Sequence, residues 1–148
     1  MSAQTQAYNP GVTTRADLEA TRAALAGCAE PGLVAAWLFG SRARGTARPG
    51  SDVDVALLYA SPPDATLSAL PERVAAAVEA AMRTEADLVV LNHAAVDLVH
   101  RVLRDGVLLL DRRPSARIAF EVRSRREYFD LLPSLGQYRR PPGREARP

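Results

Sequence analysis

Two short apolar runs restrict the fold of this chain more than any other feature of its sequence. LVAAWLF spans Leu33–Phe39, and DVDVALLY spans residues 52–59. Both runs are far shorter than the roughly 20 apolar residues needed to cross a membrane. Apolar side chains on both sides of a strand are typical of a sheet that helices cover on each face. We therefore predict that both runs are central strands.

Helices and further strands are predicted to alternate with these runs. Thr14 or Asp17 can cap a first helix that ends near the break at residues 30–32, and ADLVVL and VLLL read as a third and a fourth strand. Three more helices are predicted. The first has apolar positions at steps of three and four residues, namely Leu67, Leu70, Val74, Val78 and Met82, and the second spans 95–104. The last spans 115–132 and is expected to bury Ile118, Val122, Phe129 and Leu132. This order indicates an α/β (α+β) fold, a small mixed β-sheet flanked by helices.

The composition predicts one domain. With 148 residues and 47% hydrophobic content, the chain can build one sizeable core. We expect a flexible N-terminus at 1–13, a single domain at 14–135 and a basic Pro/Arg-rich tail at 136–148. Cys28 is the one cysteine, and neither a signal peptide nor a membrane span is recognisable, so we expect a cytoplasmic protein without disulfides or membrane association.

The basic residues are unevenly placed. All 19 are arginines, and residues 112–148 hold ten of them but four of the 17 acids. An Ala/Arg-rich coding bias explains this better than a selected binding surface, since charge runs usually form solvated faces. The tail has few aromatic residues for stacking on bases, so direct nucleic-acid binding is not expected.

Three aspartates form a candidate metal site. Asp52 and Asp54 lie two apart at the start of a strand, so their side chains share one face, and Asp87 begins the next candidate strand. Unneutralised carboxylates in this arrangement repel each other, whereas oxygen ligands suit Mg²⁺. Three acids can hold two metal ions, an arrangement used in phosphoryl and nucleotidyl transfer.

The segment between the two strands is a candidate phosphate site. Gly40 lets the backbone turn sharply, Ser41 is predicted to cap a short helical turn, and Arg42 and Arg44 could pair with phosphates. Alone, a Gly-Ser pair or a DxD often marks only a turn or a strand end. Together, at this spacing between two apolar strands, they predict a nucleoside triphosphate site. A P-loop is excluded because the chain has no lysine.

These residues resemble a known family. LFGSRARG and SDVDVALL are similar to the active-site signature of minimal nucleotidyltransferases of the DNA polymerase beta superfamily. ADLVVLN, HRVLRDGVLLLDRR and FEVRSRREYFDLLPSL resemble the antitoxins of the MntA type, which partner HEPN-domain ribonuclease toxins. The resemblance covers about 33–140. It implies the polymerase-beta-like nucleotidyltransferase fold.

The same resemblance implies an activity and residue roles. The expected reaction is transfer of AMP from ATP, with Mg²⁺, to a tyrosine hydroxyl of a cognate HEPN toxin, which neutralises the toxin. Gly40 and Ser41, with Arg42, would then bind the triphosphate. Asp52 and Asp54 would hold the metals, and Asp87 would complete the metal site and help to deprotonate the acceptor.

Two other functions stay open at this stage. The first is nucleotide transfer to a small molecule such as an aminoglycoside. The second is a non-catalytic antitoxin that acts by direct binding. Against the second, a pure binding protein has no evident reason to keep three unneutralised carboxylates together.

Overall fold

The computed structural model describes residues 12–61 and 71–139. The elements, in chain order, are α1 (Arg15–Ala26), β1 (Leu33–Phe39), α2 (Gly40–Arg44), β2 (Val53–Tyr59), α3 (Glu72–Met82), β3 (Ala86–Val90), the 3-10 turn η2 (Leu91–His93), α4 (Val96–Asp105), β4 (Val107–Asp111) and α5 (Pro114–Arg139). Within these residues, a search for a helix of sufficient length and hydropathy to span a membrane finds none.

The four described strands form one mixed sheet in the order β3-β2-β1-β4. β1 runs antiparallel to both of its neighbours, β2 and β4. β2 and β3 run parallel, as their connection through α3 allows. The predicted small mixed sheet is confirmed, and the two apolar runs that predicted it are its central strands.

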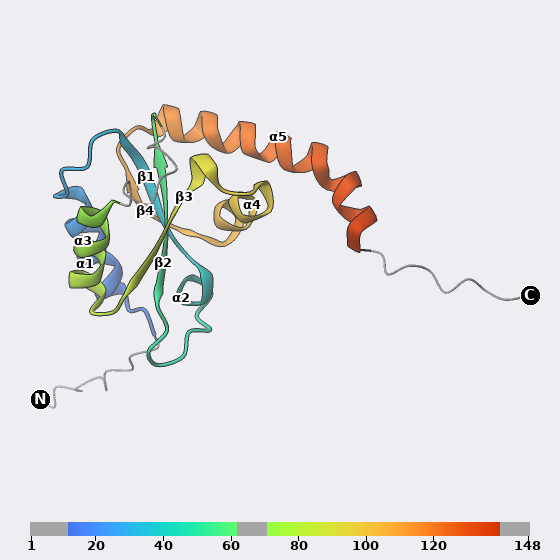
Figure 1. The fold of residues 1–148 in the computed structure, drawn as a ribbon. Coiled ribbons are helices and arrows are strands. Elements are labelled where there is room, and N and C mark those ends of the chain that lie inside the picture. The colour runs from blue at the N-terminus through green and yellow to red at the C-terminus, as the bar shows by residue number, and fades with distance from the viewer. Residues whose placement is uncertain (1–11, 62–70, 140–148) are drawn as a thin grey trace, which may run out of the picture.

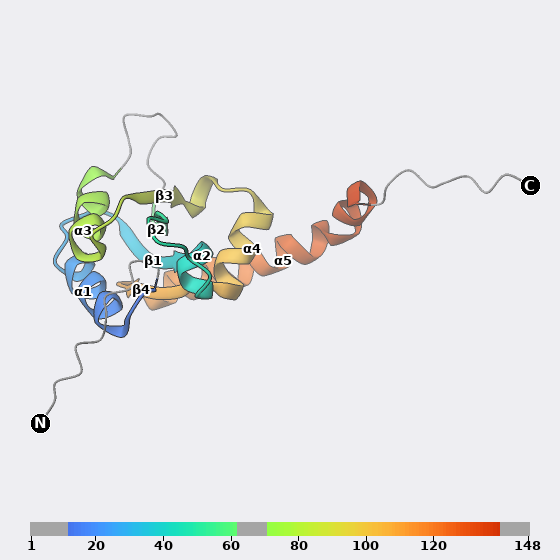
Figure 2. The same ribbon diagram turned by 90° about the horizontal axis from the view of Figure 1, so that it is seen from below.

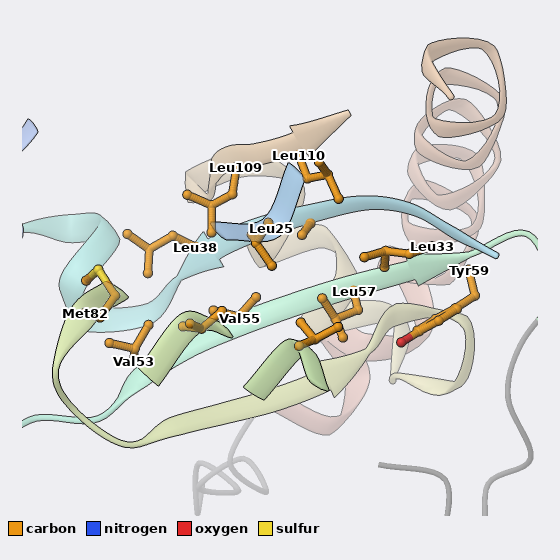
Figure 3. Close-up of a cluster of buried hydrophobic side chains, with 13 residues drawn as sticks. Leu25, Leu33, Leu38, Val53, Val55, Leu57, Tyr59, Met82, Leu109 and Leu110 are labelled. Atoms are coloured by element: carbon orange, nitrogen blue, oxygen red, sulfur yellow. The ribbon is translucent and has the colours of Figure 1, made fainter. Parts of the chain in front are cut away.

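Helices cover both faces of this sheet (Figures 1 and 2). α1 and α3 pack on one face, and the cluster beneath them is drawn in Figure 3; its members include Leu25, Leu38, Val53, Val55, Leu57, Val78 and Met82. α4 and the first half of α5 pack on the other face, over a cluster that includes Trp37, Ala56, Leu58, Val99, Val102 and Phe120. Adjacent side chains of β2 thus enter different clusters, which explains why the strand is apolar on both sides.

Local capping fixes the first helix. The Thr14 hydroxyl accepts a hydrogen bond from the Asp17 backbone N–H at 3.1 Å, and the Thr14 N–H donates to the Asp17 carboxylate at 2.8 Å. This reciprocal capping box decides between the two predicted caps in favour of Thr14. The helix ends at Ala26, earlier than predicted, because Gly27 already closes it with an N–H bond to the Ala23 carbonyl.

The other boundaries lie close to their predictions. α3 begins at Glu72 in the described chain, and the predicted apolar positions Leu67 and Leu70 lie outside the described residues. β3 ends at Val90, one residue before its predicted end, because η2 begins at Leu91. The Asn92 side chain then pairs with Tyr59, accepting from its N–H at 3.0 Å and donating to its carbonyl at 2.9 Å.

The prediction for the last helix was wrong in two respects. α5 does not stop near 132 but continues through Pro133 to Arg139. Its expected core residues are exposed instead, namely Ile118, Val122, Phe129 and Leu132. Over residues 114–134, where side-chain burial is described, the buried α5 side chains are Phe120 and Ser124. α5 packs on α4 and β1 through its first half and then extends past α4, away from the sheet (Figures 1 and 2).

Candidate active site

Asp54 lies at the junction of three strands. In the register of the sheet it is opposite Phe39, the last residue of β1, and beside Asp87 on β3. Neighbouring strands are about 4.8 Å apart, and paired residues of parallel strands face the same side. The sheet therefore brings Asp54 and Asp87 together as the sequence predicted.

Asp52 lies one residue before β2. Asp54 shares a sheet face with Ala56 and Leu58, the side on which α4 lies. Asp52 and Asp87 are exposed, whereas Asp54 is partly buried. One carboxylate is thus partly buried, and the two others are exposed.

Gly40, the residue after β1, faces Asp54. Its φ is +71°, in the left-handed region that favours glycine. A β-carbon at this position would also collide with the Asp54 carboxylate, which lies directly against the glycine. Gly40 is therefore required both by its backbone conformation and by its close contact with Asp54.

Ser41 occupies a different position from the one predicted. α2 begins at Gly40, its N-cap is Phe39, and no side chain caps it, so Ser41 lies inside the helix. The positive φ of Gly40 already makes the turn, so α2 begins two residues earlier than a Ser41 cap would allow. The Ser41 carbonyl accepts the N–H groups of Gly45 and Thr46, and this closes α2 after five residues.

Arg42 is buried, with 8% of its surface exposed. Its Nε and Nη2 both donate to the Ser51 carbonyl, at 3.1 and 2.7 Å. Ser51 in turn closes a turn with Arg48, whose N–H donates to the Ser51 hydroxyl at 3.0 Å. Arg42 thus anchors the loop that leads into Asp52. Sequence reasoning missed this role of Ser51, although RPGS is a recognisable turn sequence.

Burial and neighbouring charges raise the pKa of Asp54. Burial contributes most, followed by the negative charges of Asp87 and Asp52, while the exposed Arg44 partly opposes them. The charged form of Asp54 is therefore unfavourable in the folded chain, and a bound cation would stabilise it.

The donor set fits Mg²⁺ in chemistry, because its members are carboxylates and the environment of the partly buried Asp54 disfavours its charged form. In residues 12–61 and 71–139, however, no three Asp, Glu, His or Cys side chains are close enough together to hold a metal ion. Asp54 is only partly buried, so the exposed Asp52 and Asp87 are the ones that would have to approach it.

A known protein family matches the segment that holds these residues. The sequence matches the family described as "Polymerase beta, Nucleotidyltransferase" over residues 29–115, more than half of the chain. The chain belongs to this nucleotidyltransferase family. The matched segment contains all six predicted site residues, from Gly40 to Asp87. Among curated proteins, the sequence has no match.

Solved toxin–antitoxin structures resemble this nucleotidyltransferase. A toxin–antitoxin complex with AMP-PNP matches at 26% identity and a TM-score of 0.66, over 82% of this chain and 94% of that one. A MntA–HpeT complex with two aspartates, two positions apart, changed to glutamate matches at 25% identity with the same TM-score and coverage. A tri-AMPylated HEPN toxin of Shewanella oneidensis with its MNT antitoxin matches at 22% identity and a TM-score of 0.63, over 82% of this chain and 94% of that one, and shows the fold alone.

Proposed function

We propose that this chain is the nucleotidyltransferase antitoxin of a toxin–antitoxin pair. It transfers AMP from ATP to a tyrosine hydroxyl of a HEPN-domain ribonuclease toxin and thereby neutralises the toxin. The observation that carries the proposal is the similarity to the toxin–antitoxin complex with AMP-PNP, since this chain covers 94% of the matched chain. AMP-PNP is an ATP analogue, so a nucleotide belongs to that complex.

The first turn of α2 is assigned to the triphosphate. Gly40 and Ser41 present backbone N–H groups that no side chain caps, and such groups suit a phosphate oxygen. Arg42 supports this segment from beneath by holding the loop at Ser51. Its proposed contribution is therefore to position the loop.

The carboxylates are assigned to Mg²⁺ and to the proton. Asp52, Asp54 and Asp87 would hold the metal; the glutamate pair two positions apart in the MntA–HpeT complex has the spacing of Asp52 and Asp54 and supports this assignment. When bound, Mg²⁺ neutralises charge on the triphosphate and polarises its phosphoryl oxygens. Asp87 is exposed, so an acceptor from another protein can reach it.

The proposed reaction is a single displacement at the α-phosphorus. The tyrosine oxygen forms a bond to that phosphorus, and the bond from the α-phosphorus to the oxygen bridging to the β-phosphate breaks. Pyrophosphate leaves with the bonding electrons. The carboxylate of Asp87 accepts the tyrosine proton.

Labelled ATP tests the proposal. The chain is incubated with Mg²⁺ and its HEPN partner, once with ATP labelled at the α-phosphate and once with ATP labelled at the γ-phosphate. AMP transfer labels the partner from the α-position alone, and Asp54→Asn abolishes it. Label on a small acceptor such as an aminoglycoside, with none on the partner, would instead support the small-molecule function.

A further inference from the structure

The exposed face of α5 carries a heptad pattern. Its positions follow steps of four, three, four and three residues, and we name them the α5 seam: Ile118, Val122, Arg125, Phe129 and Leu132. This 3.5-residue period places all five on one stripe of the helix. The stripe is about 21 Å long, at 1.5 Å per residue.

Contacts on the opposite side of α5 turn this stripe outward. Phe120 and Ser124 are buried against the body of the protein. Tyr128 stacks on His100 of α4 with ring centroids 3.5 Å apart and planes parallel within 1°. These contacts fix the rotation of the helix about its axis, so the seam faces away from the sheet.

The exposure of the seam is unusual for side chains of this kind. Ile118 is 50% exposed and Phe129 56% exposed, although both are large and apolar. Single exposed apolar residues are common on protein surfaces, but four at heptad spacing, two on each side of Arg125, are typical of a helix that pairs with another helix. Val122, Arg125 and Phe129 also line a hollow of about 380 Å³ that can receive a side chain of such a helix.

Arg125 decides which helix fits. It is the central position of the seam, so an antiparallel pair of two copies would place Arg125 against Arg125. A parallel pair of copies would also place the two guanidinium groups side by side. Like charges at a closing helix interface repel. The charge therefore disfavours a second copy and favours a helix with a carboxylate at its centre.

We propose that the α5 seam docks an amphipathic helix of the toxin partner, whose apolar side chains at heptad spacing flank an Asp or Glu that pairs with Arg125. This inference rests on the proposed function, because the partner it names is the HEPN toxin. It adds the docking surface and the chemistry that selects the partner.

Calorimetric titration of the HEPN partner, without nucleotide, tests the seam. Val122→Glu and Phe129→Glu each weaken binding by at least about tenfold, as expected for a large apolar contact at an interface centre. Leu131→Glu is the matched control, since Leu131 is 42% exposed on the same helix but lies off the stripe. Binding that withstands both seam variants overturns the proposal.

Charge reversal tests the role of Arg125. Arg125→Glu weakens binding by about tenfold or more, whereas Arg126→Glu, at the edge of the same hollow but one position off the seam, weakens it less. Each surface carboxylate of the partner is then changed to Arg, one at a time, and each partner variant is titrated with Arg125→Glu. One of these partner variants restores the affinity. An equal loss from both arginine variants, or no restoring reversal, shows general attraction and overturns the assigned pair.

Two further readouts separate this proposal from the proposed function. Light scattering of the chain alone is expected to show a monomer. If it shows a dimer, and Phe129→Glu disrupts that dimer, a second copy of the chain occupies the seam and the proposal is contradicted. Seam variants keep the MgATP affinity of the parent. If the parent binds the partner through the seam but transfers no AMP, the proposed function fails and the docking surface stands.

Discussion

The carboxylate of Asp54 lies so close to Gly40 that residue 40 cannot carry a β-carbon without displacing it. Gly40→Ala is therefore expected to lower both stability and nucleotide transfer. The positive φ alone costs about 1–2 kcal/mol for a non-glycine residue, and the collision with Asp54 adds to this. Denaturant unfolding and AMP-transfer rates measure the two effects.

Gly45→Ala is the matched control for that variant. Gly45 has nearly the same φ, +72°, but nothing lies within 4 Å of a β-carbon there. The Gly45→Ala variant should lose only about 1–2 kcal/mol of stability, from the strained backbone conformation, and should keep its activity. Equal losses of stability and activity in the two variants would show that the contact with Asp54 has no consequence.

Asp54→Asn should abolish transfer yet stabilise the metal-free chain at neutral pH. The folded protein raises the pKa of Asp54 through burial and the charges of Asp87 and Asp52, so ionisation of Asp54 destabilises the fold. The free energy of unfolding contributed by this group falls as the pH rises through the raised pKa. The advantage of the Asn variant should therefore shrink as the pH falls toward the ordinary aspartate pKa of about 3.9.

Thermal unfolding in the presence of a chelator, over a range of pH, measures this effect. Asp52→Asn serves as the comparison, because Asp52 is exposed and should change the stability less. A metal-free Asp54→Asn variant that is less stable than the parent at neutral pH would contradict the electrostatic account of the site.

Arg42→Lys should act through the loop. Lysine keeps the charge but cannot donate from two nitrogens to the Ser51 carbonyl, so about 1–3 kcal/mol of stability should be lost. Asp52 becomes less well positioned, so the transfer rate should fall more than the MgATP affinity. Arg44→Lys, at an exposed position, is the control. Lost MgATP affinity at unchanged stability would make Arg42 a phosphate ligand.

The sheet and the pairing of Asp54 with Asp87 were predictable from the sequence. Leu33–Phe39 and Val53–Tyr59 are apolar on both sides, and period-two alternation places Asp54 on the same face as Ala56 whatever the rest of the fold. Asp87 lies near the start of β3, and it reaches Asp54 if β3 runs parallel to β2 as its neighbour. The connection through α3 makes this parallel pairing possible.

Features that depend on tertiary contacts were not predictable in this way. An apolar stripe such as Ile118 to Leu132 looks the same whether its own domain or another protein covers it, so the pattern was assigned to the core. The pairing of Arg42 with Ser51 depends on how the loop folds back. The start of α2 at Gly40 depends on a backbone conformation that the letters Gly-Ser do not specify.

Tandem mass spectrometry of the HEPN partner, combined with its ribonuclease activity, tests the central claim most directly. After incubation with the parent chain and MgATP, the partner should carry AMP on a tyrosine and should lose its ribonuclease activity. Asp54→Asn should still bind the partner but leave it unmodified and active after dilution. An unmodified partner that the parent and Asp54→Asn silence equally would contradict the account and establish neutralisation by binding alone.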